Sequence, residues 1–262
     1  MVLFGSLILL VGLFVGTWCL SMRMDNYSFV DVAWSLAFAP VAMVYALLLE
    51  GWGPRKAVVA FLVASWSLRL GIYLWKRVAA HHPAEDPRYG VLRNAWSANL
   101  SSRFLRFFLA QAVLVWLLML PVFLIARHPV IGFHPIELVG IALWVMALLG
   151  EGISDRQLKR FKDRNEDPSA VCEIGLWRYS RHPNYFFQSL LWWALFLMAW
   201  PTPWGVAAIL APLAMLWFLL RVTGIPLTEK LAVERKGAAY KTYQSTTSAF
   251  IPWARRAIST TS

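Results

Sequence analysis

A polar stretch directly precedes a long apolar run in this sequence, and it reads Gly175-Leu176-Trp177-Arg178-Tyr179-Ser180-Arg181-His182-Pro183-Asn184-Tyr185-Phe186-Phe187-Gln188. Two arginines, a histidine, an asparagine and two tyrosines gather within it. Pro183 suits the first turn of a helix, because the N–H that proline lacks would have no intrahelical partner there. The stretch therefore predicts a membrane helix that begins near Pro183 with a polar cluster at its N-terminal end.

This polar cluster has the chemistry of an anion site. Free backbone N–H groups and the positive end of the dipole at a helix N-terminus attract anions, and Arg178 and Arg181 add full charges. A phosphate-bearing cofactor would fit here. In a simpler interpretation, the arginines mark the cytoplasmic side of a span and the His-Pro-Asn sequence is ordinary turn chemistry. Arg-His-Pro also occurs at Arg127-His128-Pro129 without polar neighbours, so the tripeptide alone does not decide between them.

The composition is that of an integral membrane protein. Of the 262 residues, 59% are hydrophobic and only 15% are charged, whereas about a quarter of the residues in a soluble domain are charged. The net charge of +11 does not indicate nucleic acid as a partner, because the basic residues lie between apolar runs, as in loops that face anionic lipid or a phosphorylated ligand. We expect membrane lipids as partners, and the sequence indicates no oligomeric state.

Seven apolar runs are long enough to cross a bilayer as helices, which takes about 20 residues. They predict an all-α, polytopic membrane protein with about seven transmembrane helices, in a single membrane domain over residues 1–262. The first run starts at Val2 without a basic segment before it, so we interpret it as a retained span and not a cleaved signal peptide. The expected spans are 2–22, 30–49, 57–76, 104–126, 136–153, 185–200 and 204–222.

The basic residues predict the orientation of these spans. Most of the 25 lysines and arginines fall in segments that share one side of the membrane, including the long connections 77–103 and 154–184 and the chain after Arg221. The loops of the opposite side hold only Arg55, Lys56 and Arg127. Because basic loops stay in the cytoplasm, we expect the N-terminus outside and the C-terminus in the cytoplasm, in a bacterial inner membrane.

Several common kinds of site are not expected. The two cysteines, Cys19 and Cys172, form neither a plausible disulfide pair nor a Cys-x-x-Cys motif. No His or Cys cluster has the spacing of metal ligands, so no metal site is predicted. A soluble dinucleotide fingerprint and a serine-hydrolase elbow are also missing.

Charged residues inside membrane spans are costly and are therefore candidates for function. Asp31 begins the second expected span, Arg69 lies midway along the third, and Glu151 lies near the end of the fifth. Tyr73 follows Arg69 by four residues and shares its helix face. A packing role is equally open: Arg69 can pair with one of the two acids, and Asp31 can cap its helix.

Two polar segments flank the last spans. Residues 154–163 have helical spacing and form a very basic surface with Arg156, Lys159, Arg160 and Lys162, in which Asp155 can accept hydrogen bonds from a ribose or adenine. Residues 227–243 predict a charged helix at the inner surface, whose simplest role is to anchor the tail.

From Glu151 to Trp253 the chain resembles the C-terminal catalytic region of the steroid 5α-reductase-like membrane reductase superfamily, and is most similar to its bacterial branch of uncharacterised proteins. Sterol reductases and isoprenylcysteine carboxyl methyltransferases are related to it. The preceding part matches only through Asp31-x-x-Trp34 and Arg69. The matching motifs are Ser154-Asp155-x-x-Leu158, Gly175 to Gln188, Thr228-Glu229-Lys230-Leu231, Tyr240-x-x-Tyr243 and Phe250-Ile251-Pro252-Trp253.

The resemblance implies a cofactor region over 136–253 that opens to the cytoplasm and holds NADPH, and N-terminal helices over 1–126 that form a cavity for a lipid-like substrate. Hydride transfer would reduce a carbon–carbon double bond conjugated to a carbonyl, and a buried acid with a tyrosine would polarise that carbonyl. Asp31 is the candidate acid, Tyr73 the tyrosine, and Arg69 a further catalytic candidate. The implied cofactor ligands are Asp155, Lys159, Lys162, Tyr179, Arg181, His182, Asn184, Tyr185, Arg221, Glu229 and Tyr240.

Two departures from the superfamily pattern bear on the substrate. Phe187-Gln188 stands where many relatives have Gly-Glu or Gly-Asp, so a close helix approach or an acidic cofactor contact is expected to be lost. The Gln-Glu pair of true steroid 5α-reductases is missing, which argues against a steroid substrate.

Two other functions remain open. An S-adenosylmethionine-dependent lipid or prenylcysteine methyltransferase shares the Arg-His-Pro-x-Tyr element, but such enzymes have Gly where this chain has Phe187 and a Glu-Glu pair where it has only Glu229. The abundant loop cations also favour a dinucleotide with phosphates. A non-enzymatic lipid-binding or transport protein would use the same cavity, although we find no repeat symmetry of the transporter kind.

Overall fold

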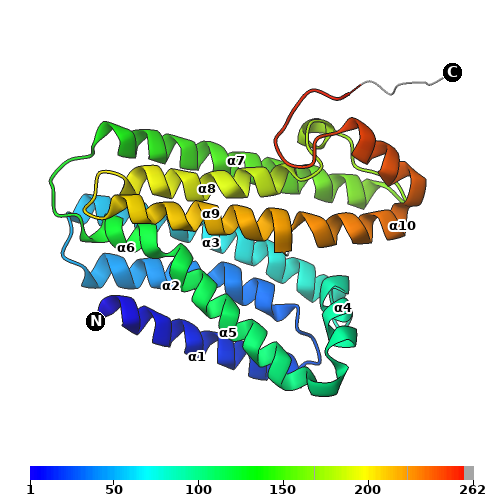
Figure 1. Ribbon diagram of the computed structural model, residues 1–262, viewed down its shortest axis with the longest axis horizontal. Coiled ribbons are helices and arrows are strands. Elements are labelled where there is room, and N and C mark those ends of the chain that lie inside the picture. Colours follow the sequence, from blue (N-terminus) through cyan, green and yellow to red (C-terminus); the bar gives the residue numbers. More distant parts are fainter. Residues whose placement is uncertain (168, 223, 257–262) are drawn as a thin grey trace. The chain divides into compact units, whose positions relative to one another are not determined.

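The protein is built from α-helices (Figure 1), which confirms the predicted all-α class. The computed structural model describes residues 1–167, 169–222 and 224–256, and these contain no β-strand. They form two compact units. The first comprises Met1–Glu137 and Met198–Ala211, and the second comprises Leu138–Leu197 and the chain from Pro212 onward. The first unit thus ends at Glu137, near the expected boundary between 1–126 and 136–253. It also includes the later segment Met198–Ala211.

The first unit packs its helices mainly around α2 and α3, and its core contains Phe38, Val63 and Trp66. Gly71 allows the close approach of α3 to α2, because a Cβ at this position would lie 2.2 Å from Cδ2 of Leu36. The helices of this unit are α1 (Val2–Arg23), α2 (Phe29–Leu48), α3 (Gly53–His81), α4 (Pro87–Ala95), α5 (Leu100–Leu118) and α6 (Leu120–Arg127), with the 3-10 turns η1 (Ser97–Asn99) and η3 (Gly205–Ile209).

The second unit begins within α7 (Pro135–Arg164), which continues well past the predicted end of its span at 153. The helix after the polar stretch, α8, starts at Pro183 as predicted. The remaining elements are η2 (Gly175–Arg178), α8 (Pro183–Ala199), α9 (Leu210–Trp217), the π-helical turn η4 (Phe218–Val222) and α10 (Ile225–Thr246). The charged segment expected as one helix over 227–243 is helical as α10, but a kink at Gly237, which has φ 57° and ψ −129°, divides it into two helices.

A glycine brings α7 and α8 together. A Cβ on Gly150 would lie 2.4 Å from Cδ1 of Phe187, so the Phe187 ring occupies the space that a side chain at Gly150 would need. The sequence suggested that Phe187-Gln188 would lose either a close helix approach or an acidic cofactor contact. The helices do approach closely here, because the missing side chain is at Gly150 on the facing helix; the loss of an acidic cofactor contact stays a prediction.

Six segments among the described residues are long and apolar enough to cross a membrane. The segment expected over 185–200 is not among them, because α8 has 17 residues, at the short end of the range for a spanning helix. The chain is a polytopic membrane protein. The six segments are Val2–Arg23, Phe29–Leu48, Gly53–His81, Ser97–Arg127, Pro135–Arg164 and Gly205–Thr246, the last of which includes the charged α10.

Candidate functional site

The Gly-Leu-Trp part of the polar stretch attaches the loop before α8 to α7. The Leu176 backbone N–H donates to Oε1 of Gln157 at 2.9 Å, and the Trp177 indole N–H donates to the Ser154 carbonyl at 2.9 Å. Gly175 has φ +54°, and a Cβ there would lie 2.2 Å from Nε2 of Gln157. Both the backbone conformation and the close contact require glycine, so this element fixes the loop on the polar end of α7.

The carboxylate of Glu229 on α10 is the centre of a hydrogen-bond network, which we call the Glu229 network. Arg181 binds it with two nitrogens, Nε to Oε1 at 2.8 Å and Nη2 to Oε2 at 2.9 Å. The His182 Nε2 lies 2.8 Å from Oε1, the Tyr240 hydroxyl donates to Oε1 at 2.9 Å, and Nε2 of Gln244 donates to Oε2 at 2.5 Å. The bidentate pairing is the strongest geometry available to an arginine and a carboxylate.

The rest of the Arg181 guanidinium holds the end of α10. Its Nη1 donates to the carbonyl oxygens of Gln244 at 3.0 Å and Thr247 at 2.5 Å. All three guanidinium nitrogens therefore have partners within the protein. The structure places Arg181, His182, Glu229 and Tyr240 together, as the motifs suggested, but it uses Arg181 to join the loop before α8 to α10.

The tail after α10 closes over the same loop. The Arg181 backbone N–H donates to the Ser248 carbonyl at 2.8 Å, and the Trp253 N–H donates to the Tyr179 carbonyl at 2.9 Å. The Ser180 hydroxyl adds a bond to the Phe250 carbonyl at 2.8 Å. The Tyr179 side chain itself remains exposed. The terminal segment thus covers the polar stretch through these backbone and side-chain hydrogen bonds.

A second group of expected ligands lies at the start of α8. The Asn184 amide nitrogen donates to Oδ1 of Asp155 on α7 at 3.3 Å, and Oδ1 of Asn184 accepts the Tyr185 N–H at 3.0 Å. The Tyr185 ring stacks on His182, with 5.4 Å between the ring centroids and 7° between the planes. His182 therefore links this group to the Glu229 network.

The other expected ligands of the second unit lie at its surface. Lys159 is exposed and pairs with Asp163 at 2.6 Å, and Lys162 is also exposed. Arg221 lies exposed in the π-helical turn η4. Among the expected cofactor residues, those near the helix termini are thus joined by hydrogen bonds, whereas these three cations lie at the exposed surface of the unit.

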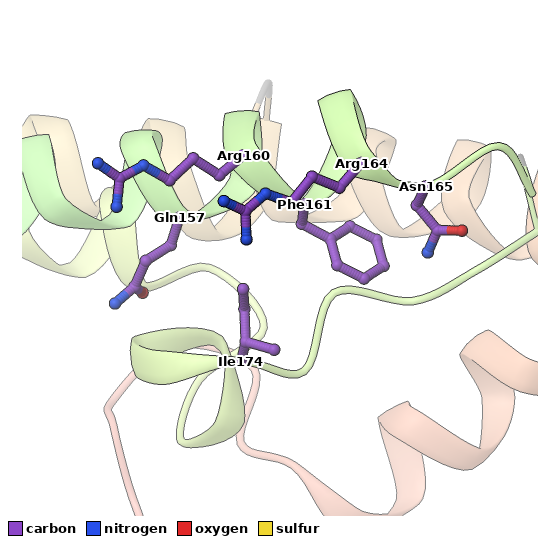
Figure 2. A pocket seen from close by; sticks show the side chains of 6 residues that line it. All are labelled: Gln157, Arg160, Phe161, Arg164, Asn165 and Ile174. Carbon is purple, nitrogen blue, oxygen red and sulfur yellow. The ribbon is translucent and has the colours of Figure 1, made fainter.

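A pocket of about 510 Å³ opens at the polar end of α7 (Figure 2). Gln157, Arg160, Phe161 and Arg164 line it from successive turns of the helix, and Asn165 and Ile174 line it from the following loop. Sequence analysis placed Arg160 on the basic surface but did not identify the pocket. The i, i+3, i+4, i+7 spacing of these residues was the available signal, because residues so spaced share one helix face.

In the first unit, Asp31 lies among cations and a tyrosine. Its Oδ2 accepts from Nη2 of Arg88 at 2.6 Å and lies 3.5 Å from Nη2 of Arg77, and its Oδ1 accepts the Tyr89 hydroxyl at 2.6 Å. Both oxygens of this carboxylate therefore have partners within the first unit.

Asp86 and Tyr89, next to this pair, were not identified from the sequence. Asp86 caps α4 by accepting the Arg88 N–H at 3.0 Å and pairs with the Arg88 side chain at 2.9 Å. Burial alone would raise the pKa of Asp86, but the hydrogen bonds and charge of Arg88 and the charge of Arg77 outweigh it and lower that pKa. Burial, together with the Asp31 charge, raises the pKa of Tyr89 well above its ordinary value, so its phenol stays protonated. Asp86-Pro87 is a typical helix start and was the available signal.

The other two catalytic candidates, Arg69 and Tyr73, lie half-buried on α3. They precede Arg77 by two turns and one turn of that helix. Asp31 contacts Arg77 at the end of α3 and Arg88 and Tyr89 on α4. The expected grouping of Asp31 with Tyr73 and Arg69 stays a prediction.

The fold and the site define a polytopic α-helical membrane protein whose second unit holds a carboxylate-centred polar network between the loop before α8 and α10. The chain belongs to the family described as "Protein of unknown function (DUF1295)", whose model matches residues 17–247.

Two curated proteins are similar to the chain. An uncharacterized protein of Schizosaccharomyces pombe is 24% identical over 267 residues, which cover 90% of this chain and 75% of that protein. The 3-oxo-5-alpha-steroid 4-dehydrogenase 1 of Mus musculus is 26% identical over 108 residues, which cover 38% of this chain and 42% of the mouse protein. This distant, partial similarity agrees with the resemblance to the steroid 5α-reductase-like superfamily. No solved structure matches the chain significantly.

Proposed function

We propose that this protein is an NADPH-dependent reductase of a carbon–carbon double bond conjugated to a carbonyl in a lipid. The observation that carries the proposal is the partial similarity of this chain to a steroid dehydrogenase. In this chain, residues of the motifs that resemble the superfamily meet in one polar site. The substrate is an isoprenoid or steroid-like enone, and the hydride transfer takes place at the cytoplasmic side of a bacterial inner membrane.

The residues of the second unit fit a phosphorylated dinucleotide. Asp155 and Asn184 offer a carboxylate and an amide beside each other for a ribose or a base. Exposed cations at the end of α7 are available for phosphates, and the neighbouring pocket of about 510 Å³ lies within the usual range of ligand sites, about 300–1,000 Å³. NADPH would supply the hydride, and these side chains would bind and orient it.

In this proposal Arg181 positions other groups. Its guanidinium holds Glu229 and the end of α10, and Glu229 in turn holds His182 and Tyr240. His182 carries the stacked Tyr185 ring. The network therefore fixes the aromatic and polar surface that a nicotinamide cofactor would contact.

The first test is a titration of the detergent-purified protein with NADPH, NADH and S-adenosylmethionine, followed by the thermal midpoint, because a ligand that binds only the folded protein raises it. We expect a saturable rise with NADPH, and oxidation of NADPH when enone lipids are added. Asn184→Ala should reduce the rise, whereas Arg235→Ala, an exposed change on α10, should not.

Other results of this titration would favour a different function. A rise with S-adenosylmethionine alone would overturn the reductase proposal in favour of methyl transfer at the same site. No rise with any of the three ligands, in a protein that unfolds cooperatively, would favour a lipid-binding protein without a cofactor.

A further inference from the structure

The pocket at the end of α7 has two arginines whose charges nothing in the described structure balances. Arg160 and Arg164 make no hydrogen bond or ion pair with any described residue, and both are exposed. They are four residues apart on one helix face, where like charges repel each other. Figure 2 shows both side chains running back along α7 in the same direction, above Gln157 and Ile174. An anion between the two groups would relieve this repulsion.

The acidic residues near the pocket either bind other residues or do not line the pocket. Asp163 pairs with Lys159 at 2.6 Å, and Glu173 pairs with Arg255. Asp167 accepts hydrogen bonds from Ser169. Glu166 is exposed and does not line the pocket. Within the described part of the chain, the positive charge of this pocket is therefore left for a ligand.

The pocket also has an apolar wall and a fixed floor. Phe161 and Ile174 supply the wall. The floor is held because Oε1 of Gln157 accepts the Leu176 N–H at 2.9 Å and Gly175 packs against the same amide. The polar stretch before α8 thus shapes this pocket as well as the Glu229 network.

We propose that this pocket binds a phosphate monoester, with the phosphate between Arg160 and Arg164 and the organic part of the ester against Phe161 and Ile174. A phosphate monoester carries close to two negative charges at neutral pH and three acceptor oxygens. Guanidinium groups match such oxygens with two parallel hydrogen bonds each. The ester comes either from a nucleotide or from the headgroup of an anionic lipid, and both share this chemistry. For the nucleotide this inference rests on the proposed function, since it names the part of the proposed NADPH site that would hold a phosphate; binding of phosphatidic acid alone would support the pocket without supporting the reductase.

The experiment uses the full chain in detergent and two probes, adenosine 2′-monophosphate and a short-chain phosphatidic acid, with adenosine as the phosphate-free control. Calorimetric titration gives the affinity of each. We expect saturable binding of at least one phosphate probe, and an affinity at least about tenfold lower in Arg160→Ala/Arg164→Ala, since each lost charge-assisted hydrogen bond is worth about that factor.

The matched control is Arg235→Ala/Lys241→Ala, which removes the same charge from exposed positions of α10 and should leave the affinity within about twofold of the original. Binding of the nucleotide alone assigns the pocket to a nucleotide, and binding of phosphatidic acid alone assigns it to a lipid headgroup; both support the site. The proposal is overturned if neither probe binds, if the pocket variant binds as well as the original, or if the control variant loses as much affinity. Arg160→Gln/Arg164→Gln, which keeps polar side chains of good helix propensity, repeats the test should the alanine variant fail to fold.

Discussion

Arg181 joins three parts of the second unit through one side chain. It lies in the loop before α8, binds Glu229 on α10 with two nitrogens, and reaches two carbonyl oxygens at the end of that helix. Both partners are largely shielded from water, with 11% and 12% of their side chains exposed. An ion pair in such surroundings costs more when one partner is lost than it contributes when it is formed, because the remaining charge is left without a partner.

We therefore expect Arg181→Ala to destabilise the protein by about 3 kcal/mol, measured by denaturant unfolding in detergent. Arg181→Ala/Glu229→Ala should be less destabilised than the sum of the two single variants, because the uncompensated carboxylate is then also gone. Additive single effects would contradict a direct interaction between the two residues. The same variants, titrated with NADPH, separate a positioning role from direct cofactor contact: a positioning role predicts that Arg181→Lys, which cannot reproduce the bidentate contact, does not recover binding.

Asp86 should make the stability of the protein depend on pH. The pKa of Asp86 is lowered in the folded state from an ordinary value of 3.8. Its ionised carboxylate therefore stabilises the folded protein fully above pH 3.8, and this stabilisation is lost as the pH falls through the folded-state pKa. Asp86→Asn should lower stability by about 1 kcal/mol near neutral pH, because asparagine still caps the helix but loses the charge pairing with Arg88 and Arg77. The difference from the original protein should shrink as the pH falls below the ordinary value of 3.8. Thermal midpoints of both proteins across this range test the prediction, and a constant difference would refute it.

At the scale of helices, the pairing of α7 with α8 depends on Gly150. The Phe187 ring lies where a Cβ at Gly150 would be, at 2.4 Å. Gly150→Ala should therefore destabilise the protein by about 1–3 kcal/mol, as expected for overpacking. Gly152→Ala is the control on the same helix, because its Cβ would meet only Nη2 of Arg156 at 3.6 Å.

A double variant tests whether the loss of stability in Gly150→Ala comes from the contact with Phe187. Gly150→Ala/Phe187→Ala should recover part of the stability lost in Gly150→Ala, because the smaller side chain opens the space that the new Cβ needs. Equal effects of Gly150→Ala and Gly152→Ala on thermal unfolding would show instead that the loss comes from helix propensity or from the unfolded chain.

At the scale of the whole molecule, the number of membrane crossings decides on which side the termini lie. Six segments meet the length of an ordinary span, and the 17-residue α8 is short but apolar. If α8 also crosses, the termini lie on opposite sides, with the C-terminus in the cytoplasm, as the distribution of basic residues predicts.

Reporter fusions test this topology. A reporter that is active only in the cytoplasm should be active at the C-terminus and inactive at the N-terminus. Activity at both ends would contradict the predicted crossing by α8. A C-terminal reporter that is inactive, with an active one at the N-terminus, would reverse the predicted orientation.

Features that depend on neighbouring residues, such as the bounds of helices, could be predicted from the sequence, whereas contacts between distant residues could not. Apolar length placed the helices α1 to α3 and α7 within a few residues, except that α7 extends to Arg164. Pro183 located the start of α8. The expected span over 104–126 is divided at Met119 into α5 and α6, because Pro121 interrupts the backbone hydrogen bonds. Motif spacing grouped Arg181, His182, Glu229 and Tyr240, but it did not show which of them bind one another.

The sequence by itself determined that this chain forms apolar helices, since backbone groups in a bilayer must find their hydrogen bonds within the same segment and a long apolar run satisfies them alone. Only the tertiary structure decided the partners of the charged groups. Glu229 meets Arg181 from 48 positions away, and Asp31 meets Tyr89 from 58 positions away. Such pairs form where packed helices bring their side chains within about 3 Å of each other, and no local pattern encodes that distance.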